Sequence, residues 1–358
     1  MGRENQFVQT VQGLTPLILS LIGVGVLVFL AARLADVLLL VFASILLAML
    51  LHAIAGPFHR RARLSRTSAL IAALLIMSLA AGLILWLLGT QIVSQLSSLS
   101  SLLPKSWAAL EARLSTSALG AAVLGQVRPA NWPSAALFGW LTRMAGSTAS
   151  ALAGAVIIIF AGSYLAFHPE TYARGALSLI PRHHRARGAE VLEACRVALT
   201  QWLIGQVLSM IFIAVTTSIG LWLIGVPSPL ALGLLAGAGH MVPVVGPWIT
   251  ALPGLVIAGA QGPQTFGWAL ALYFVTSQLE SNFLTPLVMR QMAQLPMAIT
   301  MFAVIAMGVL LGPLGVLLAT PLAVVGYILV RKLYLEDVLG ERLDPPPLQG
   351  SPSALDPG

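Results

Sequence analysis

The chain has 358 residues, of which 58% are hydrophobic and 9% are charged, and its formal net charge is +7. Soluble domains carry about 25% charged residues, so this composition excludes a protein whose whole surface faces water. The basic residues are gathered in short loops beside apolar runs, which argues against nucleic-acid binding as the reason for the positive charge.

Charged residues are absent from six long stretches of the chain. A bilayer core of about 30 Å is crossed by about 20 apolar helical residues, so each stretch is long enough for at least one crossing. We therefore predict an all-α polytopic membrane protein with about eight transmembrane segments in the lipid bilayer. The six stretches without Asp, Glu, Lys or Arg are 5–32, 37–59, 67–104, 144–167, 197–279 and 291–330.

The N-terminal region, residues 1–90, is predicted to contain three transmembrane helices. Their expected positions are 14–32, about 37–57 and about 68–89. The second and third are joined by the basic loop "HRRARLSR" at 59–66. Short basic loops mark the cytoplasmic side of a membrane protein. We therefore expect this loop and the N-terminus to be cytoplasmic.

Residues 91–147 have a different pattern and are predicted to form a non-cytoplasmic amphipathic cap. Ile92, Leu96, Leu99 and Leu103 recur with helical spacing between serines and glutamines. This spacing predicts a one-sided helix that ends near Pro104 and lies on the membrane or on neighbouring spans.

Residues 148–202 are predicted to hold a fourth span at about 149–167 and a cytoplasmic helix. Four residues of that helix, spaced as one helical face, are expected to pack inward and to continue into a fifth span at 203–225. They are Val191, Cys195, Ala198 and Trp202.

Residues 203–335 are predicted to form the C-terminal transmembrane core, with broken helices. The segment 228–260 is too long for one simple span and contains Pro243, Gly246 and Pro247 in its middle. Proline lacks an amide donor and clashes with the preceding turn, so we expect a break there. One broken span and a re-entrant hairpin both fit this pattern. Inside a bilayer such backbone must be buried in protein or line an aqueous cavity.

Two further spans are expected at about 265–289 and 295–330. The second contains Gly312 and Pro313 and is expected to be kinked or interrupted. Residues 336–358 are rich in proline and are predicted to be a disordered cytoplasmic tail. Eight crossings would place both termini in the cytoplasm.

Glu280 is the only formally charged residue between Arg196 and Arg290. An ionised carboxylate is costly inside a bilayer, so such residues usually face a cavity or a partner and are functional by default. The alternative is a neutral glutamic acid that only holds two helices together by a hydrogen bond. We predict that Glu280 binds a solute or an ion.

Polar residues close to Glu280 in the sequence, and one histidine, are predicted to share this site. The expected solute- or ion-binding residues beside Glu280 are Ser277, Gln278, Asn282 and His240. The expected broken-helix motif is Pro243, Gly246, Pro247, Thr285 and Pro286, because Pro286 leaves a carbonyl of the preceding turn free.

The sequence contains no signature of an enzyme. It has no HExxH, GxSxG or P-loop motif, and its loop histidines have no cysteine or carboxylate partners at metal-binding spacing. We expect no catalytic residues, no metal and no cofactor, and any active transport should be secondary.

Three C-terminal stretches resemble the autoinducer-2 exporter family of bacterial permeases. They are "MVPVVGPWITALPGLVIA" (241–258), "LESNFLTPLVMRQMAQLPMAI" (279–299) and "GVLLGPLGVLLATPLAVV" (308–325). The resemblance covers nearly the whole chain, and it places Glu280, Asn282 and Pro286, with the prolines and glycine of 243–247, on characteristic family positions. His240 departs from the pattern, since the family resemblance leads us to expect an asparagine or an acid there.

The resemblance implies a permease of the bacterial inner membrane. Some members of this family are described as exporters of autoinducer-2, and other members as sodium/proton antiporters. The first hypothesis is therefore a secondary exporter of a small polar solute, coupled to protons through Glu280. Autoinducer-2 is the candidate solute. The second is a sodium(lithium)/proton antiporter. A hypothesis of another class is a non-transporting membrane scaffold. The glycine-rich spans are compatible with a homo-oligomer, and no nucleic-acid partner is expected.

Overall fold

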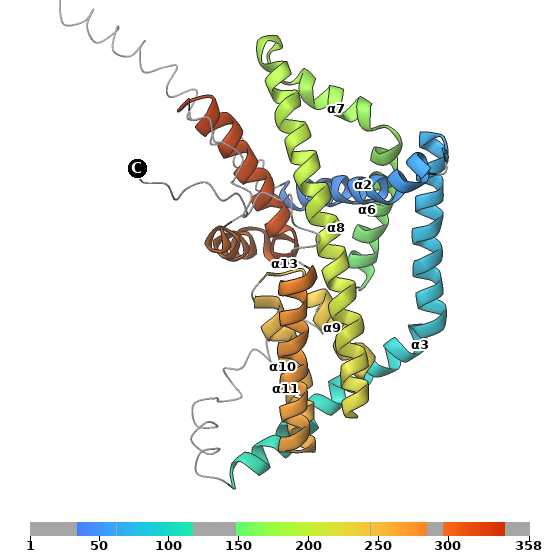
Figure 1. Cartoon of the computed structure of the whole chain (residues 1–358), viewed down its shortest axis with the longest axis vertical. Helices are drawn as coiled ribbons and strands as arrows, with labels where there is room; N and C mark the ends of the chain where they lie inside the picture. The colour runs from blue at the N-terminus through green and yellow to red at the C-terminus, as the bar shows by residue number, and fades with distance from the viewer. Residues whose placement is uncertain (1–33, 62, 117–147, 244, 285–295, 341–358) are drawn as a thin grey trace, which may run out of the picture.

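The computed structural model describes residues 34–61, 63–116, 148–243, 245–284 and 296–340. Those residues form helices and turns and no strand, which confirms the all-α class (Figure 1). The α-helices are α2 (Ala35–Arg61), α3 (Arg66–Leu114), α6 (Thr148–Phe167), α7 (Pro169–Ser178), α8 (Arg185–Ile224), α9 (Pro229–Gly239), α10 (Val245–Gln261), α11 (Pro263–Leu279) and α13 (Met297–Leu329). The short elements are the 3₁₀ turn η2 (Arg182–His184) and the π-helical segments η3 (Glu280–Leu284) and η4 (Val330–Glu336).

Several of these helices are suited to a membrane. In the described part of the chain, three are long and apolar enough to cross it, namely Ala35–Arg61, Arg182–Ile224 and Ala298–Glu336. A fourth crossing results if the pair Ala153–Phe167 and Pro169–Ser178, bent by 88°, counts as one span. The expected first span at 14–32 lies outside the described residues, so the number of eight stays a prediction.

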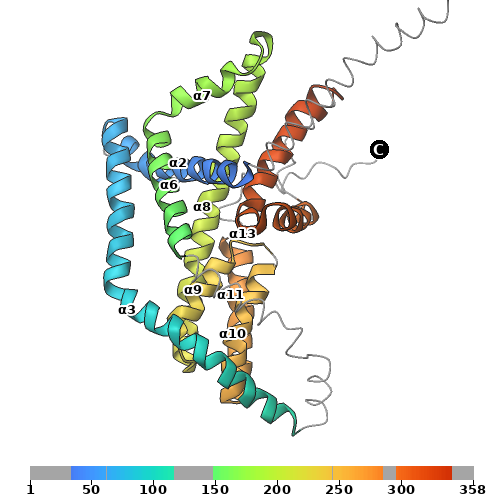
Figure 2. The same cartoon turned by 180° about the vertical axis from the view of Figure 1, so that it is seen from behind.

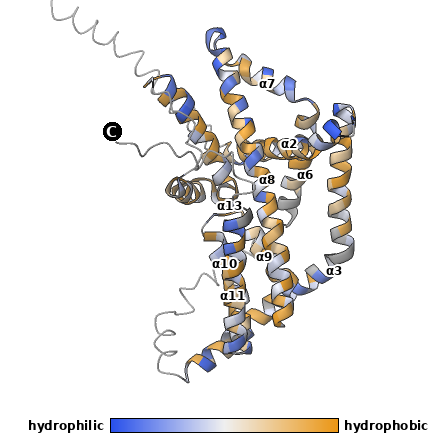
Figure 3. Cartoon of the chain, viewed as in Figure 1, coloured by the Kyte–Doolittle hydropathy of each residue, from blue (hydrophilic) through white to orange (hydrophobic). Residues whose placement is uncertain are grey.

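The outer surface of the helices is apolar. Large hydrophobic side chains such as Leu79, Trp86, Phe160, Trp222 and Val309 are exposed. Orange, hydrophobic positions accordingly cover most of the helices (Figure 3). A soluble monomer rarely exposes contiguous apolar surface on this scale, so this surface is the one that lipid covers.

Helices α2 and α6 pack side by side in the same direction. A Cβ on Gly154 would lie 3.7 Å from Leu40, and one on Gly162 would lie 2.9 Å from a Leu47 methyl and from the Ser44 carbonyl. The contacts advance together along both helices, so the two run parallel. Small residues let helix backbones approach closely.

Helix α3 continues past the break that the sequence predicted near Pro104; that expectation is wrong. The helix ends only at Leu114. Leu99 and Leu103 are buried together with Leu221 of α8 and Ile257 of α10, and this packing holds the helix beyond the proline. Figure 2 shows this part of α3 running beside α9 and α10.

Helix α3 therefore crosses the expected boundary between the regions 1–90 and 91–147. Most of the cap, 117–147, lies outside the described residues. The division of the chain into regions stays a prediction.

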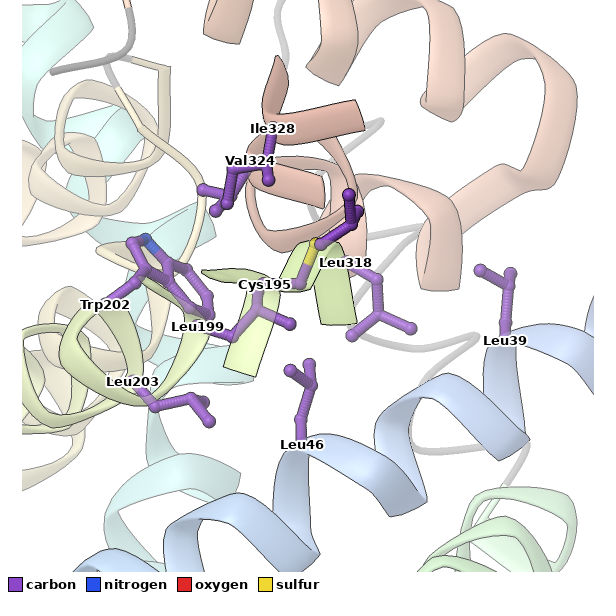
Figure 4. Close-up of a cluster of buried hydrophobic side chains, with 10 residues drawn as sticks. Leu39, Leu46, Cys195, Leu199, Trp202, Leu203, Leu318, Val324 and Ile328 are labelled. Carbon is purple, nitrogen blue, oxygen red and sulfur yellow. The ribbon is translucent and has the colours of Figure 1, made fainter. Parts of the chain in front are cut away.

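The long helix α8 joins the expected cytoplasmic helix and fifth span without a break, as the sequence predicted. Cys195 and Trp202 are buried on its inner side, beside Leu46 of α2 and Leu318 and Val324 of α13 (Figure 4). This apolar cluster fixes α8 between the N-terminal and C-terminal helices.

Helices α9 and α10 form a hairpin, which decides between the two alternatives for 228–260. At its open end, Gln261 Nε2 donates to the Gly225 carbonyl at 3.2 Å. At its tip, a Cβ on Gly246 would lie only 1.8 Å from the Gly239 carbonyl oxygen. With 11 residues, α9 is about 16 Å long and too short to cross a bilayer. The segment enters and returns at the same end of α8.

Helix α13 is interrupted at Gly312, as expected from its glycines and prolines. Gly312 has φ +64° and ψ −152°, which lies outside the helical region. A Cβ on Gly308 would be 2.9 Å from Val316, eight residues later. In a continuous helix these residues would be about 12 Å apart. The chain therefore folds back sharply at Gly312.

Candidate functional site

Glu280 is buried at the end of α11, where the helix widens into the π-helical segment η3. Only 8% of the residue is exposed. The Ser209 hydroxyl of α8 donates to its Oε1 at 3.0 Å, within a buried contact. Ser281 Oγ lies 3.4 Å from the second carboxyl oxygen. The carboxyl group therefore faces α8 instead of the exterior.

Glu280 lies at mid-depth in the apolar bundle. Its partner Ser209 comes 13 residues after Arg196, the last charge before the span, and 16 residues before Gly225, where α8 ends. At 1.5 Å per residue these separations are about 20 Å and about 24 Å. The carboxyl group is thus far from both ends of the uncharged stretch.

The tip of the α9–α10 hairpin reaches the same place. Gln206 Nε2 of α8 donates to the His240 carbonyl at 3.0 Å. His240 Nε2 lies 3.5 Å from Glu280 Oε1. The other ring nitrogen, Nδ1, is buried and has no hydrogen-bond partner among the described residues. Three elements, α8, the hairpin tip and α11, therefore meet around one carboxyl group.

Glycines allow the hairpin to approach α8 this closely. A Cβ on Gly237 would lie 2.6 Å from the Met210 carbonyl oxygen of α8. Inside the hairpin, a Cβ on Gly239 would lie 2.2 Å from Thr250 Cγ2. The Thr250 hydroxyl donates to the Gly246 carbonyl at 2.8 Å, so a buried polar group at the tip is satisfied locally.

The backbone around Glu280 is irregular on both sides of the contact. The π-helical segment η3 begins at Glu280, and the hairpin turns between His240 and Val245. Single π-helical turns are frequent at functional sites, because they displace backbone groups from the regular α-helical pattern. Non-helical backbone at this depth must be buried or line a cavity.

The structure brings only part of the predicted site together. Glu280 and His240 are in contact, and Pro243, Gly246 and Pro247 form the hairpin tip beside them. Thr285 and Pro286 lie outside the described residues.

Ser277, Gln278 and Asn282 are exposed. At 100° per residue, Gln278 and Asn282 lie about 160° from Glu280 around the helix. The structure therefore does not bring these two amides to the carboxyl group.

Sequence reasoning missed Ser209 and Gln206, the two α8 residues that contact the site. They are three residues apart and therefore share one face of a helix. A glutamine and a serine within an uncharged membrane stretch were a usable signal, because polar groups in a span usually face the bundle interior.

The described residues do not offer a metal site. No group of three or more His, Cys, Asp or Glu residues within the described ranges could hold a metal ion. The expectations of no metal and no cofactor stay predictions.

A second charged cluster lies at the beginning of α8 and joins it to η4. Arg187 contacts Glu190 at 2.6 Å and Glu336 at 2.9 Å, and Asp337 at 2.8 Å. Lys332 Nζ contacts Glu190 at 3.0 Å and Glu336 at 3.1 Å. Hydrogen bonds from Arg187 and Lys332 lower the pKa of both glutamates. This cluster is partly or largely exposed to water, in contrast to Glu280.

Comparison with known proteins bears on what such a bundle does. The family model described as "AI-2E family transporter" matches residues 17–334. The chain belongs to the AI-2E transporter family. This confirms the resemblance inferred from the C-terminal motifs.

Curated relatives point the same way. "Putative transport protein YrrI" of Bacillus subtilis (strain 168) is 30% identical over 167 residues, 47% of each chain. "Putative transport protein YueF" of the same strain is 27% identical over 164 residues, 46% of this chain and 43% of the relative. "Putative transport protein MT0215" of Mycobacterium tuberculosis (strain CDC 1551 / Oshkosh) is 34% identical over 127 residues, which are 33% of this chain and 34% of the relative. The chain spans about half the length of the first two relatives, and about a third of the last. The family membership and the apolar helices together make this a membrane protein of a transport family.

Proposed function

We propose that this chain is a secondary transporter that exports a small polar solute across the bacterial inner membrane, with protons coupled through Glu280. Autoinducer-2 is the first candidate cargo. The observation that carries the proposal is a single carboxyl group, buried at mid-depth, where a helical hairpin tip meets two other helices. The family membership supports transport as the activity.

Burial makes the charge of Glu280 dependent on its surroundings. An ionised carboxylate away from water is tolerated only with hydrogen bonds or a partner charge. Ser209 supplies one hydrogen bond, and His240, when protonated, supplies a partner charge. A change that moved the hairpin tip away would weaken that pairing and favour proton uptake by Glu280.

The hairpin supplies the element that can move. Secondary transporters often bind their solutes near the midplane, beside discontinuous helices whose free backbone groups contact the solute. Here the turn after α9, the start of η3 and the fold of α13 at Gly312 provide such interruptions. The proposed cycle alternates the hairpin tip between contact with Glu280 and contact with the solute.

Protons suit this site better than sodium as the coupling ion. Hard cations prefer oxygen ligands, whereas one of the groups that face the carboxyl group is the imidazole nitrogen of His240. A glutamate and a histidine 3.5 Å apart can share or exchange a proton. The sodium(lithium)/proton antiporter is kept as an outcome of the test below.

The orientation follows from the basic loops. Arg60 and Arg61 are the last residues of α2 and Arg63 follows them, while Arg182 lies just before α8 and Arg185 is its first residue. The positive-inside rule assigns both basic clusters to the cytoplasm, and we propose that both termini are cytoplasmic as well. The proposed partners are the lipid bilayer and a small polar solute or a proton, with a homo-oligomer as a further possibility.

The test uses purified protein in liposomes with an imposed pH gradient and a panel of small polar solutes that includes autoinducer-2. The parent should drive transport of at least one solute, and Glu280→Gln should reduce it to the level of empty liposomes. Glu193→Gln, which removes an exposed glutamate of the same α8 helix, is the matched control and should transport normally.

Three results would contradict the proposal. Collapse of the pH gradient by added sodium without any solute would favour the antiporter. Normal gradient-driven transport by Glu280→Gln would remove the coupling role. Absence of any flux in the parent would favour the scaffold, if deleting the protein from cells produces a defect that deletion of residues 91–147 reproduces.

A further inference from the structure

A pocket with three nitrogen-bearing side chains lies away from Glu280, between the end of α2 and the start of α3. Its volume is about 300 Å³. The polar side chains that line it are His52, His59 and Arg66, and the small residues Ala55, Gly56 and Ala69 complete its wall. None of these residues belongs to the proposed transport site.

The nitrogen-bearing side chains of this pocket are held in place but are not all satisfied. His59 Nδ1 donates to the Leu64 carbonyl at 2.8 Å, which leaves its Nε2 available. His52 is hydrogen-bonded to the backbone of Ala166. Its Nε2 is buried and has no hydrogen-bond partner among the described residues. Because Nδ1 is the donor in each ring, each Nε2 keeps a lone pair that can accept a hydrogen bond from a ligand, for example from a headgroup hydroxyl.

The charge around the pocket is strongly positive. Arg60 and Arg61 are the last residues of α2, Arg63 lies in the adjoining loop, and Arg66 stands in the first turn of α3. The acidic group that faces Arg66 is Glu170 of α7, at 3.4 Å, with side chains 60% and 74% exposed. An exposed ion pair of this length contributes little and is easily exchanged. The first turn of a helix adds a partial positive charge and free amide groups.

Small residues create the space. No heavy atom lies within 4 Å of a Cβ built on Gly56, so the cavity is open at that position. An arginine guanidinium and a helix N-terminus are groups that bind phosphate oxygens. We propose that this pocket binds a phosphate group, specifically the headgroup phosphate of an anionic lipid of the surrounding membrane.

The position of the pocket favours a lipid over a free phosphate. It opens where an apolar helix meets its basic loop, which is the depth of the lipid headgroups. Along α3, the side chains of Ile71, Leu75 and Leu79 are exposed and apolar, as needed beside acyl chains. Basic pockets between membrane helices on the cytoplasmic side bind anionic headgroups by the same chemistry.

The test measures binding of phosphatidylglycerol, phosphatidylcholine and inorganic phosphate to the purified full-length protein in a neutral detergent by native mass spectrometry. Phosphatidylglycerol should bind in preference to the other two. Arg66→Gln and Gly56→Leu should each weaken it about tenfold, since one removes a charge-assisted hydrogen bond and the other fills the cavity. Arg61→Gln removes an equal charge at the end of α2, from a residue that does not line the pocket, and should retain the parent's affinity.

The outcomes separate the possibilities. Equal phosphatidylglycerol binding by the parent, Arg66→Gln and Gly56→Leu would overturn the proposal, and so would an equal loss in Arg61→Gln, which would indicate unspecific attraction. Tight binding of inorganic phosphate, lost in the two pocket variants, would overturn the lipid as the source and identify a soluble phosphate instead. Glu280→Gln should bind phosphatidylglycerol like the parent, so failure of the transport proposal leaves this result unaffected.

Discussion

The beginning and the middle of α8 differ in how charged groups are used there. At its beginning, Arg187 and Lys332 make five short ionic contacts with three partly exposed carboxylates, and three of these contacts connect α8 to η4 and to Asp337 just after it. At its centre, Glu280 stands among apolar helices with a serine hydroxyl and a histidine beside it. Both clusters join segments far apart in the sequence, and only the second does so inside the bundle.

The two clusters show how the contribution of charged groups to the free energy of folding depends on burial. Exposed ion pairs are screened by water and contribute about 0–1 kcal/mol each, so the network at the beginning of α8 contributes little to the stability of the fold. A buried carboxyl group is an expensive way to join two helices, because an apolar pair of similar volume would serve at least as well. Stability alone therefore does not account for a carboxyl group at this position, which supports the proposed role of Glu280 in coupling.

The sharpest way to break the central cluster without touching a charge is Gly246→Ala. Its Cβ would lie 1.8 Å from the Gly239 carbonyl oxygen, so the hairpin tip cannot keep its turn. We expect loss of transport and a lower Tm in detergent, since overpacking typically costs about 1–3 kcal/mol. Gly267→Ala in α11 is the control: no heavy atom lies within 4 Å there, and alanine favours a helix by about 1 kcal/mol. Equal behaviour of the two variants would contradict the hairpin geometry.

A smaller change sharpens the comparison by removing the hydroxyl that faces the acid. Ser209→Ala deletes the 3.0 Å hydrogen bond to Glu280. Hydrogen bonds to charged groups contribute about 1.5–3 kcal/mol, so we expect gradient-driven flux to fall about tenfold and its pH dependence to shift. Thr216→Val on the same helix removes a hydroxyl bonded only within α8 and should leave flux unchanged. An unchanged pH profile in Ser209→Ala would show that the serine does not tune the acid.

The smallest effect is expected at the exposed network. The pKa of Glu336 is lowered from 4.5 by hydrogen bonds from Arg187 and Lys332. A lowered carboxyl pKa stabilises the fold above about pH 4.5 and loses that contribution as the pH falls through the lowered value. Glu336→Gln should therefore reduce Tm slightly at pH 7, with the difference from the parent vanishing in acid. Thermal unfolding at both pH values checks this, and a transport loss as large as that of Glu280→Gln would erase the distinction between the two clusters.

The fold class and the central residue could be predicted from the sequence because both depend on local composition. Long uncharged stretches require a bilayer or a large core, and Glu280 stood out as the only formal charge between Arg196 and Arg290. The interruption of α13 at Gly312 was predictable for the same reason, since glycine and proline act on their own turn of the backbone.

Other features depended on packing between distant segments, which no local pattern encodes. The prolines of 243–247 fitted a broken span as well as a hairpin, and the contact between Gln261 and Gly225 decided for the hairpin. Pro104 did not end α3, because Leu99 and Leu103 are buried against other helices. The pairing of Ser209 with Glu280 could not be predicted from local sequence, because the two residues are 71 positions apart.

The most direct test of the central claim counts protons when the solute binds. Purified parent protein in weakly buffered solution, with a pH-sensitive dye, should exchange protons with the medium on adding the transported solute, at about one per site if Glu280 carries the coupling. Glu280→Gln should bind the solute with no proton exchange. Equal proton exchange by the two proteins at equal solute occupancy would contradict the account.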